Sequence, residues 1–134
     1  MTDQTSGGAA APVVRQTGAP ADTVVVLSTA PDALLAKRIA HVLVEESLVA
    51  CAQVGAAMTA MYLWQGTLQG ADEVPLTFKT TADVLPALHA RLCALHPYEI
   101  PEFVVLGVPA GSRAYLDWVA QATRPALQTG SPAA

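Results

Sequence analysis

The chain has 134 residues, of which 52% are hydrophobic and 13% are charged, and its formal net charge is −4. This length suits one domain, and the acidic balance argues against a general nucleic-acid binder, which needs a basic surface for phosphates. No run of basic residues is present to attract an anionic membrane surface, and no apolar run approaches the roughly 20 residues that span a bilayer.

The two ends of the sequence differ in composition from the rest. Residues 1–22 are mostly small or polar, so we expect a disordered N-terminal tail. Residues 124–134 are similar and are expected to form a flexible C-terminal tail, which leaves residues 23–123 as the folded domain. The N-terminus lacks the pattern of a signal peptide, and Cys51 and Cys93 are too far apart for a CxxC pair. We therefore expect a cytoplasmic protein.

The first two predicted elements are a strand and a helix. Residues 23–29 (TVVVLST) are apolar at both parities, which is typical of a strand covered on both faces. Residues 29–46 form an amphipathic helix in this prediction, with Thr29 and Asp32 resembling a capping box and Pro31 in the first turn. One face of the predicted helix carries Leu35, Ile39, Val42 and Leu43.

A long β-hairpin is predicted next. Residues 54–64 form the outgoing strand, with a bend or bulge expected at Gly55, and Gln65 and Gly66 form the turn. Residues 67–80 return, with a loop or bulge expected at residues 69–72. Pro75 disfavours a fully paired central strand, so we expect an irregularity or a sheet edge there.

The predicted hairpin is apolar on both faces. A half-exposed strand would alternate apolar with polar residues, whereas both parities of this strand are apolar. One parity carries Met58, Ala60, Tyr62 and Trp64, and the other carries Ala57, Met61 and Leu63. A domain this small can rarely cover both faces of so long a strand, so we predict that copies of the chain associate.

The last predicted elements complete a known architecture. Residues 80–96 form a second helix that starts close to Pro86, residues 102–108 form a strand, and residues 112–123 form a closing helix. The apolar face of the second helix carries Leu85, Leu88, Leu92 and Leu95. The first six elements have the order of the ferredoxin-like βαββαβ sandwich, an α+β fold with an antiparallel sheet and two helices on one face. The closing helix is an addition at the C-terminal end.

Residues 96–102 (HPYEIPE) carry the most chemically suggestive cluster of side chains. The prolines restrict the backbone, so the segment can be a stiff connector between the second helix and the last strand. A metal site is the alternative. In an extended conformation, however, His96, Glu99 and Glu102 would lie about 9 Å apart, whereas ligands lie about 2.0–2.2 Å from their ion. The segment would need donors from another strand or subunit.

Six motifs together resemble one family. VVVLSTAP, ACAQV, MYLWQGTLQ, EVPLTFKTT, HPYEIPE and YLDW occur in the order typical of the CutA family, the divalent-cation tolerance proteins, over residues 23–123. This resemblance implies a ferredoxin-like subunit, similar to signalling proteins of the PII class, that assembles as a homotrimer through its long hairpin. It also implies a role in tolerance of copper and other divalent cations.

The resemblance suggests candidate metal ligands. Copper ligands proposed for bacterial members are a cysteine in the first strand and two histidines before the Pro-Tyr pair; here Ser28 and Leu95 replace two of the three. His96 remains, and Cys51 matches a cysteine common in the family. His96 and Cys51 are therefore the candidate ligands for copper or another divalent cation, with weak or indirect binding expected. Cys51 is alternatively a small buried hydrophobic residue.

A ligand cleft is a second implication of the resemblance. The residues Trp64, Glu73, Lys79 and Tyr98 match recurring family positions and are expected to line a cleft between subunits. Lys79 would bind a small anionic ligand there, as in a PII-like sensor or adaptor. Alternatively, Glu73 and Lys79 form a structural pair in the trimer interface. A third possibility is a scaffold that binds no small ligand and anchors a protein partner.

The remaining polar residues favour simpler interpretations. His41 and Glu45 are spaced as a solvent-facing helix pair, and His89 is expected on the surface. Ser28 has no nucleophile elbow around it, and no glycine-rich phosphate loop is present. We therefore expect no enzymatic activity.

Overall fold

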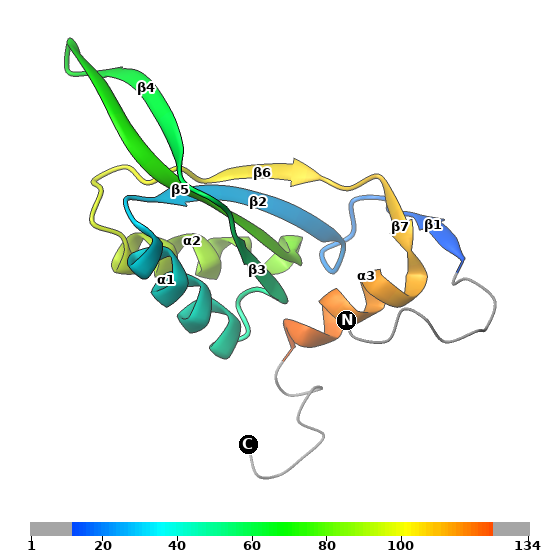
Figure 1. Cartoon of the computed structure of the whole chain (residues 1–134). Coiled ribbons are helices and arrows are strands. Elements are labelled where there is room, and N and C mark those ends of the chain that lie inside the picture. Colours follow the sequence, from blue (N-terminus) through cyan, green and yellow to red (C-terminus); the bar gives the residue numbers. More distant parts are fainter. Residues whose placement is uncertain (1–11, 125–134) are drawn as a thin grey trace.

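The main sheet of the protein has the ferredoxin-like strand order. The structure, a computed structural model, describes residues 12–124 (Figure 1). The sheet contains β2 (Thr23–Ala30), β3 (Cys51–Val54), β5 (Thr67–Thr81) and β6 (Val104–Gly107) in the antiparallel order β3-β5-β2-β6. Helices α1 (Ala33–Glu45) and α2 (Leu85–Leu95) cover one face of it (Figure 1). The predicted fold is thus confirmed.

Asp32 starts helix α1. Its Oδ1 accepts a hydrogen bond from the amide of Leu35, 2.8 Å away, which satisfies one of the free N–H groups of the first turn. Thr29 belongs to strand β2 instead, so the predicted capping role of Thr29 is wrong. A short 3₁₀ turn, η1 (Ala82–Val84), precedes α2, and Pro86 lies in the first turn of α2, where no N–H is needed.

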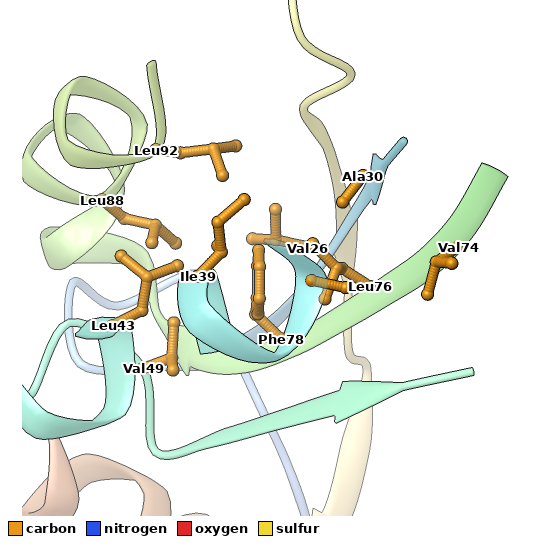
Figure 2. Close-up of a cluster of buried hydrophobic side chains, with 11 residues drawn as sticks. Val26, Ala30, Ile39, Leu43, Val49, Val74, Leu76, Phe78, Leu88 and Leu92 are labelled. Carbon is orange, nitrogen blue, oxygen red and sulfur yellow. The ribbon is translucent and has the colours of Figure 1, made fainter. Parts of the chain in front are cut away.

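The core lies between the sheet and the two helices (Figure 2). Phe78 of β5 packs there with residues from both helices, and it is fully buried. Burial of such a side chain contributes about 1.5–3 kcal/mol. The other fully buried members include Val26, Ile39, Leu43, Leu76, Leu88 and Leu92. The predicted apolar faces of both helices therefore supply the core.

The hairpin differs in detail from its prediction. The outgoing arm is two strands, β3 and β4 (Met58–Trp64), with residues 55–57 between them. Gln65 and Gly66 have φ values of 51° and 81°, as a tight hairpin turn requires. The returning arm, β5, is continuous, so the predicted loop at residues 69–72 is wrong.

Pro75 marks the point where β5 changes partners. Residues up to Glu73 pair with β4, and residues from Leu76 onwards pair with β3. The carbonyl oxygen of Pro75 accepts a hydrogen bond from Gly55, 2.9 Å away. In an antiparallel strand, the N–H and C=O of one residue point towards the same neighbouring strand. The nitrogen of Pro75, which carries no hydrogen, therefore points towards the break between β3 and β4. The predicted irregularity at Pro75 is confirmed in this form.

The N-terminal segment is more ordered than predicted. Strand β1 (Val13–Arg15) pairs with β7 (Ala110–Ser112), and the sequence predicts neither strand. The side-chain amide of Gln16 donates to the carbonyls of Thr23 and Val108 and accepts from the amide of Thr23. The prediction of a disordered tail is therefore wrong for residues 12–22, while residues 1–11 lie outside the described part of the chain.

Helix α3 (Arg113–Ala122) closes the domain. The hydroxyl of Ser112 caps it by accepting from the amide of Tyr115, 3.2 Å away. Arg124, assigned to the C-terminal tail by the sequence, forms an ion pair with Asp83; residues 125–134 lie outside the described residues.

The described helices are short. Within residues 12–124, none is long and apolar enough to cross a membrane.

Candidate functional site

A cavity of about 740 Å³ opens between one face of the hairpin, from its turn to Glu73, and the segment that follows α2. Its wall contains three carboxylate side chains and three aromatic rings. The carboxylates belong to Glu73, Glu99 and Glu102, and the rings belong to Tyr62, Trp64 and Tyr98. We call this cavity the acidic pocket. No lysine, arginine or histidine is among its lining residues in the described part of the chain.

Strand parity places the hairpin residues of the pocket. Tyr62 and Trp64 point to one face of β4, and their cross-strand partners Gln69 and Thr67 share that face. Glu73, opposite Met58, lies on the same face. The opposite face of the hairpin carries Met61, Leu63 and Leu68, whose exposed fractions are 76%, 70% and 70%. The hairpin thus has a pocket face and an apolar outer face.

Glu73 is the buried acid of the pocket. Only 7% of the residue is exposed, and its Oε2 accepts a hydrogen bond from the hydroxyl of Tyr98, 3.1 Å away. None of the ion pairs found within residues 12–124 involves Glu73. Partial burial raises the pKa of Tyr98 above its usual value, and the hydrogen bond to Glu73 and the Glu73 charge raise it further. A buried carboxylate without a basic partner favours the approach of a cation.

His96 positions Tyr98. Its Nδ1 accepts a hydrogen bond from the amide of Tyr98 at 3.1 Å. Its Nε2 therefore carries the hydrogen that is donated to the carbonyl oxygen of Thr29 at 2.7 Å. The residue is 8% exposed, and its ring centroid lies 4.7 Å from that of Tyr98. Both ring nitrogens are engaged, which leaves neither free for a metal ion in this arrangement.

The two predicted metal ligands lie apart. Cys51 begins β3 opposite Lys79, whereas His96 bonds to Thr29, which lies opposite Pro75. Pro75 and Lys79 are four positions apart on β5, about 13 Å along the strand. Within residues 12–124, no three His, Cys, Asp or Glu side chains form a metal cluster.

Lys79 lies outside the acidic pocket. It is six residues from Glu73 on β5, about 20 Å along the strand. Its Nζ donates to the side-chain oxygen of Gln53 at 2.8 Å. Within one subunit Lys79 therefore lies apart from Trp64 and Tyr98, and its place in a cleft between subunits stays a prediction.

Other polar residues have structural partners. The buried hydroxyl of Ser28 donates to the carbonyl of Glu102 at 2.7 Å, which ties β2 to the pocket segment. His41 lies 3.2 Å from Glu45 on the exposed surface of α1, as predicted. His89 is exposed, as predicted. The sequence analysis does not predict its contact with Cys93. Their spacing of four residues on one helix is the sequence pattern that could have indicated this contact.

Comparisons with known proteins agree with one another. The family model "CutA1 divalent ion tolerance protein" matches residues 24–122. The divalent-cation tolerance protein CutA of Thermus thermophilus is 44% identical over 99 residues, which cover 74% of this chain and 96% of that protein. Protein CutA of Mus musculus is 36% identical over 103 residues, covering 77% of this chain but 58% of the mouse protein. The crystal structure of CutA1 from Shewanella sp. SIB1 has a TM-score of 0.75 and 35% identity, with 77% of this chain and 96% of that chain covered.

Proposed function

This chain belongs to the CutA1 divalent ion tolerance family, and from that premise we propose that it acts as a cytoplasmic homotrimer in tolerance of divalent cations, without catalysing a reaction. The membership confirms the resemblance that the motifs indicated. The observation that carries the assembly is the apolar outer face of the hairpin, where Met61, Leu63 and Leu68 are at least 70% exposed. Contiguous exposed apolar surface of this kind marks an interaction site.

A second exposed feature supports association. Strand β6 is the last strand of the sheet, so one of its edges is unpaired in the described chain. Its residues Val104, Val105 and Leu106 are 45%, 40% and 45% exposed. An apolar sheet edge without charges or proline pairs readily with another chain. The resemblance to the CutA family implies that three copies close this assembly.

The proposed absence of catalysis is supported by the use of the polar groups. The hydroxyl of Ser28 and the Nε2–H of His96 both donate to backbone carbonyls. These two groups are therefore engaged in holding the fold together.

Light scattering tests the assembly. We expect a particle of three times the 13.8 kDa chain mass. The variant Leu63→Glu places a charge on the outer face of the hairpin and should dissociate the trimer at micromolar concentration. The matched control is Leu34→Glu, because Leu34 is 81% exposed on the helical layer, and this variant should remain trimeric. A monomeric wild-type chain would refute the assembly.

Growth under metal stress tests the tolerance role. A strain that lacks the gene should grow more slowly than its parent in graded copper, zinc or cobalt, and the wild-type gene should restore growth. Leu63→Glu should restore it poorly if the trimer is the active form. Equal growth of all strains at every metal concentration would contradict the role.

Recognition of a small cation in the acidic pocket is a second candidate function. Within residues 12–124 Glu73 is buried and has no ion-pair partner, and the pocket wall contains aromatic rings, which can bind an ammonium group through their π faces. The sequence instead suggested an anionic ligand, bound by Lys79 in a cleft between subunits. Thermal-shift measurements with tetramethylammonium and 1,4-diaminobutane should show a saturable stabilisation that Glu73→Gln removes. Stabilisation by organic anions, lost in Lys79→Ala, would favour an anionic ligand instead.

A further inference from the structure

Helix α2 carries a histidine and a cysteine whose donor atoms meet. The Nε2 of His89 and the Sγ of Cys93 lie 3.4 Å apart, and both residues are exposed. Their spacing of four residues places them on the same side of the helix. Neither residue lines the acidic pocket, and α2 belongs to the helical layer rather than to the hairpin (Figure 1).

The imidazole is held in place by packing. The ring centroid of His89 lies 4.7 Å from that of Phe103, at an interplanar angle of 60°. Phe103 itself packs against the hydrophobic core. The ring is therefore oriented before any ligand arrives, and the thiol is positioned by the helix backbone, which lowers the cost of binding.

The separation of the two donors suits one metal ion. A tetrahedral zinc ion has Zn–S and Zn–N distances of about 2.3 Å and 2.0–2.1 Å, which place the sulfur and nitrogen roughly 3.6 Å apart. The Nε2–Sγ distance of 3.4 Å is close to this separation. We propose that His89 and Cys93 form a two-donor binding site for a thiophilic divalent d¹⁰ cation such as Zn²⁺ or Cd²⁺.

The chemistry of the pair is consistent with this ion class. Thiolate and imidazole both suit zinc, whereas magnesium and calcium prefer oxygen donors. On binding, the thiol releases its proton to solvent, and the sulfur and the neutral Nε2 each donate a lone pair to the ion. Because the pair is exposed, water fills the remaining coordination positions, and the ion can exchange with other ligands.

Arg91, the arginine of α2, does not oppose a cation there. Arg91 lies between the two donors in sequence, but its guanidinium forms two hydrogen bonds of 2.9 Å to the carboxylate of Glu46. The positive charge is therefore paired at the interface between α2 and the C-terminal end of α1. The absence of a third donor within residues 12–124 predicts a weaker and more exchangeable site than a closed structural zinc centre.

Competition with a fluorescent zinc chelator tests the proposal on the full-length protein, with its thiols kept reduced by a phosphine. We expect one Zn²⁺ per chain. Cys93→Ser and His89→Gln should each reduce the zinc affinity by more than roughly tenfold, because loss of even an outer-shell partner of a metal ligand lowers the affinity by about that factor. With Cd²⁺ as the probe, an ultraviolet sulfur-to-metal charge-transfer band should appear in the wild type and disappear in Cys93→Ser.

Matched controls keep the result specific. Cys51→Ser removes the other cysteine, and His41→Gln removes the other exposed helix histidine with an i, i+4 partner. Both should bind Zn²⁺ as the wild type does. Equal affinity in all variants would overturn the site, and so would a loss confined to Cys51→Ser or binding that survives in His89→Gln. The light-scattering and growth tests are independent of these outcomes.

Discussion

The hydroxyl of Tyr98 donates a hydrogen bond to Oε2 of Glu73 across 3.1 Å, and this bond joins the segment after α2 to strand β5. The accepting carboxylate belongs to a residue that is only 7% exposed. The two walls of the acidic pocket are therefore held at a defined separation by one bond to a charged acceptor.

Removal of that hydroxyl should destabilise the fold. Tyr98→Phe leaves the buried Glu73 carboxylate without its donor, so we expect the free energy of unfolding to fall by about 1–3 kcal/mol. Urea denaturation at a fixed protein concentration measures this. Tyr62→Phe is the control, because no hydrogen bond of the Tyr62 hydroxyl is found in residues 12–124. If both substitutions lowered the free energy of unfolding equally, the hydrogen bond from Tyr98 to Glu73 would have no special role in stability.

The same contact predicts an alkaline pH dependence. The pKa of Tyr98 is raised by partial burial, by its hydrogen bond to Glu73 and by the Glu73 charge. The protonated phenol is thus favoured in the folded state. Its stabilising contribution should be complete below the usual tyrosine pKa of about 10 and should be lost as the pH rises through the higher folded value. The wild-type minus Tyr98→Phe ultraviolet titration isolates this group, and Glu73→Gln should lower its pKa.

His96 should matter for stability rather than for metal affinity. His96→Ala loses the hydrogen bonds to Thr29 and Tyr98, so we expect a loss of about 2–3 kcal/mol in the free energy of unfolding. Zinc affinity, measured by chelator competition, should be unchanged. His41→Ala, on the exposed surface of α1, should stay within about 0.5 kcal/mol of the wild type. A variant with normal stability and lost metal binding would make His96 a ligand after all.

Gly55 should not tolerate a side chain. A Cβ there would lie 2.7 Å from Cγ of Pro75, so Gly55→Ala must shift the junction of β3, β4 and β5. Overpacking of this kind costs about 1–3 kcal/mol. Gly70 lies in the same hairpin, where an added Cβ would meet nothing within 4 Å, and Gly70→Ala should be neutral or slightly stabilising. Thermal unfolding of the Gly55→Ala and Gly70→Ala variants measures this difference. Equal stability of the two variants would contradict a role for close packing against Pro75.

Gln16 should be a structural residue although it lies in a segment of low hydrophobicity. Gln16→Ala removes three hydrogen bonds to the backbone of Thr23 and Val108, with an expected loss of about 1–3 kcal/mol. Thr17→Ala changes a neighbouring exposed side chain and should have little effect. Indistinguishable unfolding curves for the two variants would show that the segment contributes little.

The fold was largely predictable because its signals are local. Helical spacing of leucines, β-branched runs and the Gln65–Gly66 turn each identify an element from its own residues. Strands β1 and β7 have no such signal, because their pairing joins residues about a hundred positions apart and depends on the side chain of Gln16. Composition alone assigned that segment to a tail.

The site was predictable in its parts but not in its arrangement. The family resemblance grouped Trp64, Glu73 and Tyr98, which line the acidic pocket of one chain, with Lys79, which has the same parity on β5 as Glu73. Parity does not report distance along a strand, and six residues separate the two. His96 illustrates a second limit, since a sequence shows a donor nitrogen but not whether the backbone already uses it.

The continuity of β5 has a consequence for the speed and cost of assembly. One unbroken strand from Thr67 to Thr81 forms half of the hairpin at one end and the centre of the sheet at the other. The direction of the projecting arm is therefore fixed by the part of β5 that lies in the core. A partner that docks on this arm orders little new chain, so the conformational entropy lost on association is small, and the encounter resembles the docking of two rigid bodies.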